Sequence, residues 1–171
     1  MSRADGEEEA TEVWRVGEIG ADEAESLMYQ AIHRYAADRA AGKDGESYLF
    51  FVGRENYPMS WVSGATYPWG KAQVLAQGTD VVLIGCGVLL DKAISAGKQL
   101  AEQGVKATVI NNPFVNHVDL ETIGAAVKAA NGRVVTIEDH QIIGGMGACG
   151  IESRCCSTFL TEFSPISIKM A

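Results

Sequence analysis

The residues best suited to chemistry in this chain gather near its C-terminal end. A group of acidic, histidine and glycine residues follows a short β-branched apolar run at residues 134–137: Glu138, Asp139, His140, Gly144, Gly145 and Gly147. Carboxylates beside an imidazole could act as an acid/base cluster, and the glycines let backbone N–H groups approach a partner closely. Charged residues also commonly end a buried strand, where they solvate its tip or contact another domain or subunit. We interpret the group as structural.

A single arginine offers a second kind of chemistry, the binding of an anion. Arg54 comes directly after a near-continuous apolar run at residues 47–52, and Glu55 and Asn56 follow it. A guanidinium at the C-terminal edge of a parallel strand can hold an anionic substrate with two parallel hydrogen bonds. An exposed loop arginine is the simpler interpretation, so residue chemistry alone leaves both open.

The glycine pair around Cys86 invites comparison with a dinucleotide-binding loop. Gly85 and Gly87 follow the apolar run at residues 79–84, but the third glycine of that motif would fall at Leu90. The acidic residue expected after the next strand is also absent, because that strand runs into Asn111 and Asn112. We therefore expect a tight turn from strand to helix and no cofactor site.

The cysteines form no recognisable metal site. No C-x-x-C pair and no histidine at zinc-ligand spacing occurs among them: Cys86, Cys149, Cys155 and Cys156. The adjacent pair at 155 and 156 allows redox chemistry, but reduced, inert thiols fit better. His33 and His117 also have no partner at ligand spacing, so we predict no bound metal and no catalytic residue in this chain.

Composition narrows the class of partner and the compartment. The net charge is -8, and no window concentrates Lys and Arg, which argues against a nucleic-acid partner. No apolar stretch approaches the roughly 20 residues of a membrane span, and the first residues lack the apolar core of a signal peptide. A cytoplasmic protein is the simplest expectation.

These candidate residues need a scaffold, and the chain alternates strand and helix patterns. Strands are predicted at residues 47–52, 71–75, 79–84, 106–110, 133–137 and 165–170. Helices are predicted at residues 22–41, between Leu89 and Gly104, and between a capping Asp119 and Gly132. Such alternation indicates βαβ units, hence an α/β fold with a mostly parallel sheet.

Three motifs in one order give the chain a family resemblance. The segments Tyr67–Ala72 (YPWGKA), residues 79–87 (TDVVLIGCG) and residues 136–148 (TIEDHQIIGGMGA) resemble the C-terminal domain of transketolase, over about residues 48–148. The resemblance implies a three-layer α/β domain at residues 67–171 that lacks its last helix. Residues 21–66 resemble the end of a pyrimidine-binding domain plus a linker, and residues 1–20 are an acidic, partly disordered tail.

The resemblance also implies cofactors and a site residue. Transketolases use thiamine diphosphate and magnesium to move a two-carbon ketol unit between sugar phosphates, such as those of the pentose phosphate pathway. Neither the family's metal-binding motif nor its pyrimidine-binding segment is present. We therefore expect this chain alone to bind neither thiamine diphosphate nor magnesium. Arg54 matches the family's substrate-phosphate arginine in an Arg-x-Asn setting. The Glu138 to Gly147 region matches a structural signature of the domain.

The expected function is that of a C-terminal part or subunit of transketolase, inactive alone. It would serve in assembly with the thiamine-binding domains or subunit, and in the sugar-phosphate channel. Aromatic residues that we expect to be exposed suggest a homo-oligomer: Tyr48, Phe50, Phe51, Trp61, Tyr67 and Trp69. The corresponding part of a deoxyxylulose-phosphate synthase or a 2-oxoacid dehydrogenase is one alternative. A non-catalytic regulatory or small-ligand binding module is another.

Overall fold

A four-stranded sheet forms the centre of the C-terminal part of the chain. The computed structural model describes residues 13–17, 19, 21–52, 66–139 and 143–148. Within them, β3 (Gln73–Ala76), β4 (Val81–Gly85), β5 (Ala107–Asn111) and β6 (Val134–Ile137) are arranged in the order β3-β5-β4-β6. Strands β4, β5 and β6 are parallel, and β3 is antiparallel to β5. The expected mostly parallel sheet is confirmed.

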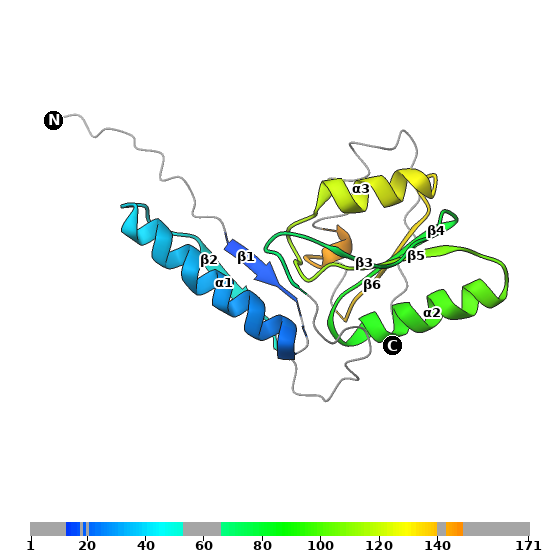
Figure 1. The fold of residues 1–171 in the computed structure, drawn as a ribbon, viewed down its shortest axis with the longest axis horizontal. Helices are drawn as coiled ribbons and strands as arrows, with labels where there is room; N and C mark the ends of the chain where they lie inside the picture. Colours follow the sequence, from blue (N-terminus) through cyan, green and yellow to red (C-terminus); the bar gives the residue numbers. More distant parts are fainter. Residues whose placement is uncertain (1–12, 18, 20, 53–65, 140–142, 149–171) are drawn as a thin grey trace.

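Two helices cover this sheet, one on each face. Helix α2 (Leu90–Glu102) connects β4 to β5, and α3 (Leu120–Ala129) connects β5 to β6. The two crossovers run in opposite directions across the sheet. Crossovers between parallel strands are right-handed in nearly all proteins, so the two helices are expected on opposite faces, and Figure 1 shows them there. The predicted three-layer α/β architecture is therefore present.

Strand β4 shows why the sheet needs both helices. Val82 and Ile84 are fully buried in one core cluster with Ile123 and Val127 of α3. The side chain between them, Leu83, points to the other face and packs with Ala93 of α2. A strand buried on both faces is expected to be continuously apolar, and this one is.

The predicted elements of this part lie within two residues of the observed ones. Asp119 is the N-cap of α3, and its carboxylate accepts a hydrogen bond from the Thr122 N–H. Gly104 and Gly132 follow the two helices with φ of +82° and +78°, in the left-handed region that glycine adopts without strain. The strand predicted at residues 165–170 lies outside the described residues. None of the described helices is long and apolar enough to cross a membrane.

A smaller unit precedes this domain. Strand β1 (Val13–Val16) pairs in parallel with β2 (Ser47–Phe50), and α1 (Ala21–Ala40) connects them. Helix α1 agrees with the helix predicted at residues 22–41. Strand β1 was not predicted, because its four residues stand among polar and acidic ones. A near-continuous apolar run such as residues 47–52 is typical of a strand covered on both faces, but Leu49 of β2 is 47% exposed on this two-stranded sheet.

Strand β1 also joins the small unit to the larger domain. Its backbone bonds to the segment after β5: the Gly17 N–H donates to the Pro113 carbonyl at 2.8 Å, and the Val115 N–H donates to the Arg15 carbonyl at 2.8 Å. The Asn116 side-chain amide makes two further hydrogen bonds to β1: its NH₂ group donates to the Val13 carbonyl, and its oxygen accepts the Arg15 N–H. Residues far apart in sequence thus continue the strand pairing, which explains why so short a segment is ordered as a strand.

An aromatic cluster fills the space between the two units. Trp14 of β1 lies edge-on to Trp69 at 5.3 Å between ring centroids and to Phe114 at 5.6 Å. Tyr67 is buried, and Tyr48 and Phe50 pack against the same cluster. The expectation that these aromatic residues form an exposed patch is wrong for the described ones, because Tyr67 is buried and the others, Tyr48, Phe50, Phe51 and Trp69, are half-buried. Trp61 lies outside the described residues.

Candidate functional site

The parallel strands bring the predicted site residues to one edge of the sheet. Gly85, the last residue of β4, is level with Asn111 of β5 and with Ile137 of β6. Cys86, Asn112 and Glu138, the next residues of the three strands, therefore follow side by side at the carboxyl edge. Open α/β sheets place their ligands at this edge, so it is the first place to test for a functional site.

Glu138 binds the backbone that follows it. One carboxylate oxygen accepts the Met146 N–H at 2.6 Å, and the other accepts the Gly147 N–H at 2.9 Å. The chain turns helical at Met146, where backbone N–H groups have no partner within the helix. Carboxylates are stabilised at such a position by the hydrogen bonds and by the helix dipole. Glu138 thus joins the end of β6 to the start of the next helical turn.

The glycines after Glu138 make this turn possible. A Cβ at Gly147 would lie 2.8 Å from Oγ1 of Thr136 and 3.3 Å from Oε1 of Glu138, so a larger residue there would disturb the contact. Gly144 has a φ of +88°, which favours glycine. Gly145 is buried in the same turn. These glycines serve the local backbone geometry.

The rest of the predicted cluster is only partly described. Asp139 is exposed and lines a cavity of about 80 Å³ together with Glu138, Cys86 and Phe51. The cavity lies between the small N-terminal unit and the sheet edge, since Gly17 also lines it. It has room for a few water molecules at most, because a liquid water occupies about 30 Å³. His140 and Arg54 lie outside the described residues.

The turn at Gly85 and Gly87 agrees with the sequence interpretation. Gly87 has a φ of +56° and begins a short 3-10 helix, Gly87–Leu89, that leads directly into α2. A Cβ at Gly85 would lie 3.3 Å from the Cα of Leu90, so glycine permits the close approach of helix and strand. Leu90, at the position of the missing third glycine, is fully buried.

A buried polar contact at the same edge was not found from the sequence. Glu23, in the first turn of α1, is 1% exposed, and its Oε1 accepts a hydrogen bond from the Asn111 side-chain amide at 2.8 Å. The same amide also donates to Oε1 of Gln73 at 3.2 Å. An acidic residue in the first turn of a helix ordinarily faces water, so sequence gives no signal for its burial. The contact ties the N-terminal unit to the end of β5.

A lysine and two carboxylates form an ionic cluster at the start of α3. The Lys71 ammonium is 3.4 Å from the Asp119 carboxylate and 3.0 Å from that of Glu121. Burial alone would raise the pKa of Asp119, but hydrogen bonds from Thr122 and from the Ala72 N–H, together with the Lys71 charge, hold that pKa below its ordinary value. Asp119 is therefore a structural carboxylate that remains ionised at neutral pH.

The described residues at this sheet edge offer no metal-ligand cluster and only a small cavity. No group of three or more His, Cys, Asp or Glu side chains gathers among them in a way that could hold a metal ion. The edge carboxylate of Glu138 is already engaged by two backbone N–H groups. The cavity of about 80 Å³ beside it is much smaller than the roughly 300 Å³ or more that ligand sites occupy.

Comparisons with known proteins agree with this architecture. Residues 70–153 match the transketolase C-terminal domain family. A 1-deoxy-D-xylulose-5-phosphate synthase of Desulfitobacterium hafniense is 40% identical over 85 residues, which are 50% of this chain and 13% of that enzyme. One of the subunits of an apulose-4-phosphate transketolase of Phocaeicola vulgatus is 38% identical over 84 residues, 49% of this chain and 27% of that polypeptide. The chain thus matches only a minor part of each relative.

Solved structures show the same fold over a longer range. A split-gene transketolase, described as an inactive β4 tetramer, superposes with a TM-score of 0.68 at 24% identity, covering 91% of this chain and 47% of that one. This likeness includes the small N-terminal unit as well as the sheet. Residues 70–153 of this chain are a transketolase C-terminal domain, the module shared by the thiamine-diphosphate-dependent transketolases and deoxyxylulose-phosphate synthases.

Proposed function

We propose that this chain is the C-terminal part of a thiamine-diphosphate-dependent transketolase and works only together with the domains that bind the cofactor. In that role it contributes assembly contacts and one wall of the sugar-phosphate channel. The reaction of the complete enzyme is the transfer of a two-carbon ketol unit between sugar phosphates.

The observation that carries this proposal is the joining of the two units. The small unit packs on the C-terminal domain through the pairing of β1, the aromatic cluster around Trp14, and the buried contact of Glu23 with Asn111. The Gln30 side chain adds two further bonds across the same boundary, to the Tyr67 carbonyl and from the Trp69 N–H. A fold of this extent, 91% of the chain, also occurs in the split-gene transketolase.

The sheet edge supports an assembly role better than a catalytic one. A general base needs a carboxylate that can reach a substrate proton, whereas both oxygens of Glu138 bind the backbone of Met146 and Gly147. The described residues also do not fit thiamine diphosphate with its metal, because they offer neither a metal-ligand cluster nor a cavity of sufficient size at this edge. The chemistry that this cofactor supplies, stabilisation of a carbanion, belongs to the complete enzyme.

Arg54 is the residue we assign to substrate binding. Phe51 lines the small cavity at the sheet edge, and its N–H donates to the Val16 carbonyl at 3.0 Å. Arg54 follows Phe51 by three residues in the sequence. A guanidinium at that edge would bind a sugar phosphate by charge-assisted hydrogen bonds.

A second candidate is the corresponding part of a deoxyxylulose-phosphate synthase. The 40% identity to the Desulfitobacterium hafniense enzyme over the C-terminal domain favours it. Both candidates assign this chain the same place in a larger enzyme and differ in the reaction of that enzyme.

Reconstitution distinguishes the two candidates. The chain is mixed with a polypeptide from the same genome that carries the thiamine-binding domains, and the mixture is assayed for ketol transfer and for deoxyxylulose phosphate formation. We expect ketol transfer from the mixture and none from either component. Formation of deoxyxylulose phosphate alone would select the second candidate. Full activity of the partner without this chain would contradict both and favour a non-catalytic module.

A further inference from the structure

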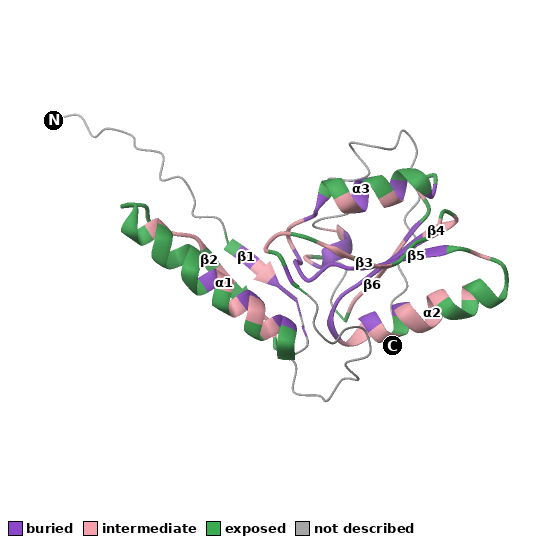
Figure 2. Ribbon diagram, viewed as in Figure 1, coloured by how far each residue is buried: buried purple, intermediate pink, exposed green. Residues whose placement is uncertain are grey.

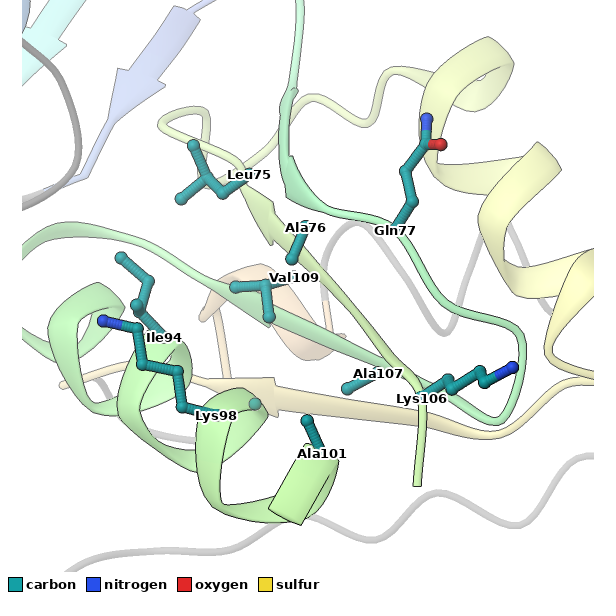
Figure 3. Close-up of a pocket in the computed structure, with 10 residues that line it drawn as sticks. Leu75, Ala76, Gln77, Ile94, Lys98, Ala101, Lys106, Ala107 and Val109 are labelled. Carbon is teal, nitrogen blue, oxygen red and sulfur yellow. The ribbon is translucent and has the colours of Figure 1, made fainter. Parts of the chain in front are cut away.

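A groove on the α2 side of the sheet lies away from the edge described above. Its volume is about 430 Å³, within the range of small-molecule sites, and it runs between α2 and the pair of strands β3 and β5. Figure 3 shows it, with Leu75 and Ile94 near one end and Ala101, Ala107 and Lys106 near the other.

Small residues explain why the groove is open. At Gly97 the helix lies close to the sheet, since a Cβ there would come within 2.8 Å of Cγ2 of Val109. Farther along α2 and the strands, the lining side chains are alanines: Ala76, Ala101 and Ala107. Their short side chains do not fill the space between helix and sheet. The groove therefore results from this particular sequence and has an apolar floor formed by Leu75, Ile94 and Val109.

The charges at the groove are all of one sign. Lys98 and Lys106 line it, and none of the described residues that line it is acidic. In Figure 3 the Lys98 ammonium lies beside Ile94, whereas that of Lys106 lies at the opposite end. An acid outside the lining, Asp80, accepts the Lys106 backbone N–H at 2.7 Å. Two cations here contrast with the chain's net charge of -8.

We infer that this groove binds a small amphipathic anion, a molecule with an apolar body and a carboxylate or phosphate at one end. The apolar body lies on Leu75, Ile94 and Val109, and the anionic end meets Lys98 or Lys106. Lysine stems can cover the apolar body while their ammonium groups stay in water. The groove shares no lining residue with the small cavity beside Glu138, so it can be tested on this chain without the cofactor-binding partner.

Nuclear magnetic resonance of the labelled chain tests the site with octanoate as the probe. We expect saturable shifts at the amides of Leu75, Ile94 and Val109, with a Kd on the order of 1 mM or below for so small a ligand. The neutral match, 1-octanol, should bind about threefold to fivefold more weakly because it lacks the charge. Inorganic phosphate, which lacks the apolar body, should produce no saturable shift at these residues.

Variants of the groove sharpen the test. The double variant Lys98→Glu and Lys106→Glu should weaken octanoate by at least about fivefold, whereas Lys92→Glu, on the same helix outside the groove, should not. Ala101→Trp should fill the gap and abolish binding with the thermal midpoint preserved. Equal binding of octanol, equal effects of the Lys92 and groove variants, or no saturable shift with octanoate would each overturn the inference.

Discussion

At the residue scale, the acidic group after β6 serves the backbone. Glu138 is the point at which a strand tip, a glycine turn and a helix start are held together. Its neighbour Asp139 differs in being exposed to solvent. Glu138 is therefore a structural carboxylate, whereas Asp139 is a surface carboxylate. Replacing each residue in turn separates the two roles.

We predict that Glu138→Gln destabilises the chain, because an amide offers one acceptor oxygen and no charge to the two N–H groups. The expected loss is about 1–2 kcal/mol in the free energy of unfolding, measured by urea denaturation. Asp139→Asn is the matched control and should change that free energy by less than about 0.5 kcal/mol. Equal effects of the two substitutions would show that the backbone contacts of Glu138 contribute little.

A second prediction concerns Arg54. If its guanidinium binds the substrate phosphate, Arg54→Ala in the reconstituted enzyme should lower kcat/KM for phosphorylated substrates by about tenfold to a hundredfold, since a charge-assisted contact contributes about 1.5–3 kcal/mol. Unphosphorylated substrates should lose much less. Arg39→Ala, an exposed arginine near the end of α1, is the control and should leave both unchanged. Similar losses for both substrate types would mean that Arg54 acts structurally.

Sequence predicts residue roles when the signal is local. The Asp119 cap and the glycines that follow the two helices depend on residues a few positions away, and they were predicted correctly. The hydrogen bonds of Glu138 come from backbone N–H groups eight and nine residues later in the chain. The burial of Glu23 depends on Asn111, 88 residues later. Contacts of these kinds leave no local pattern.

At the scale of elements, α3 depends on an ionised cap. The Asp119 carboxylate accepts from Thr122 and from the Ala72 N–H, so it fixes the start of α3 to the residue before β3. The pKa of Asp119 is lower in the folded chain than in the unfolded one. Asp119 therefore stabilises the fold at pH values above its unfolded pKa, which is about 3.9. That contribution is lost as the pH falls through the folded value.

Asp119→Ala should therefore cost about 1–2 kcal/mol at pH 7, the usual effect of removing a cap. The difference in unfolding free energy between the original chain and the variant should shrink as the pH is lowered below about 4. Chemical denaturation at a series of pH values measures this. Asp91→Ala, in the first turn of α2, is the comparison on the other helix. A difference that stays constant down to acidic pH would refute the assigned role.

The elements themselves were largely predictable, with one informative exception. The three parallel strands of the central sheet are rich in β-branched residues, and the helices between them carry apolar faces, so local pattern was sufficient there. Strand β1 has only four residues, one of them arginine, and it is formed by pairing with β2 and with residues 114–116. Tertiary pairing of that kind overrides weak local propensity.

At the scale of the whole molecule, helix α1 carries exposed apolar side chains, whereas the sequence analysis predicted an exposed patch of aromatic residues elsewhere. The described aromatic residues of that prediction are buried or half-buried. The exposed large apolar side chains of α1 are Tyr29, Ile32 and Tyr35, which are 65%, 68% and 47% exposed. Figure 2 shows this helix as largely exposed along its length. An exposed stripe on one helix is typical of an interaction surface.

We therefore expect the isolated chain to self-associate through α1. Ile32→Glu should shift the mass measured by light scattering toward the monomer, because a charge would be buried in the contact. Leu120→Glu, at an exposed apolar position on α3, is the control and should leave the mass unchanged. A strictly monomeric original chain at high concentration would contradict this expectation.

The central claim is that this chain completes a thiamine-diphosphate enzyme but does not hold the cofactor by itself. Calorimetric titration of thiamine diphosphate with magnesium tests it most directly, on the isolated chain and on its equimolar mixture with the polypeptide that carries the thiamine-binding domains. The account predicts no measurable binding by the isolated chain, and saturable binding accompanied by ketol transfer in the mixture. Micromolar binding of thiamine diphosphate by the isolated chain would contradict the account.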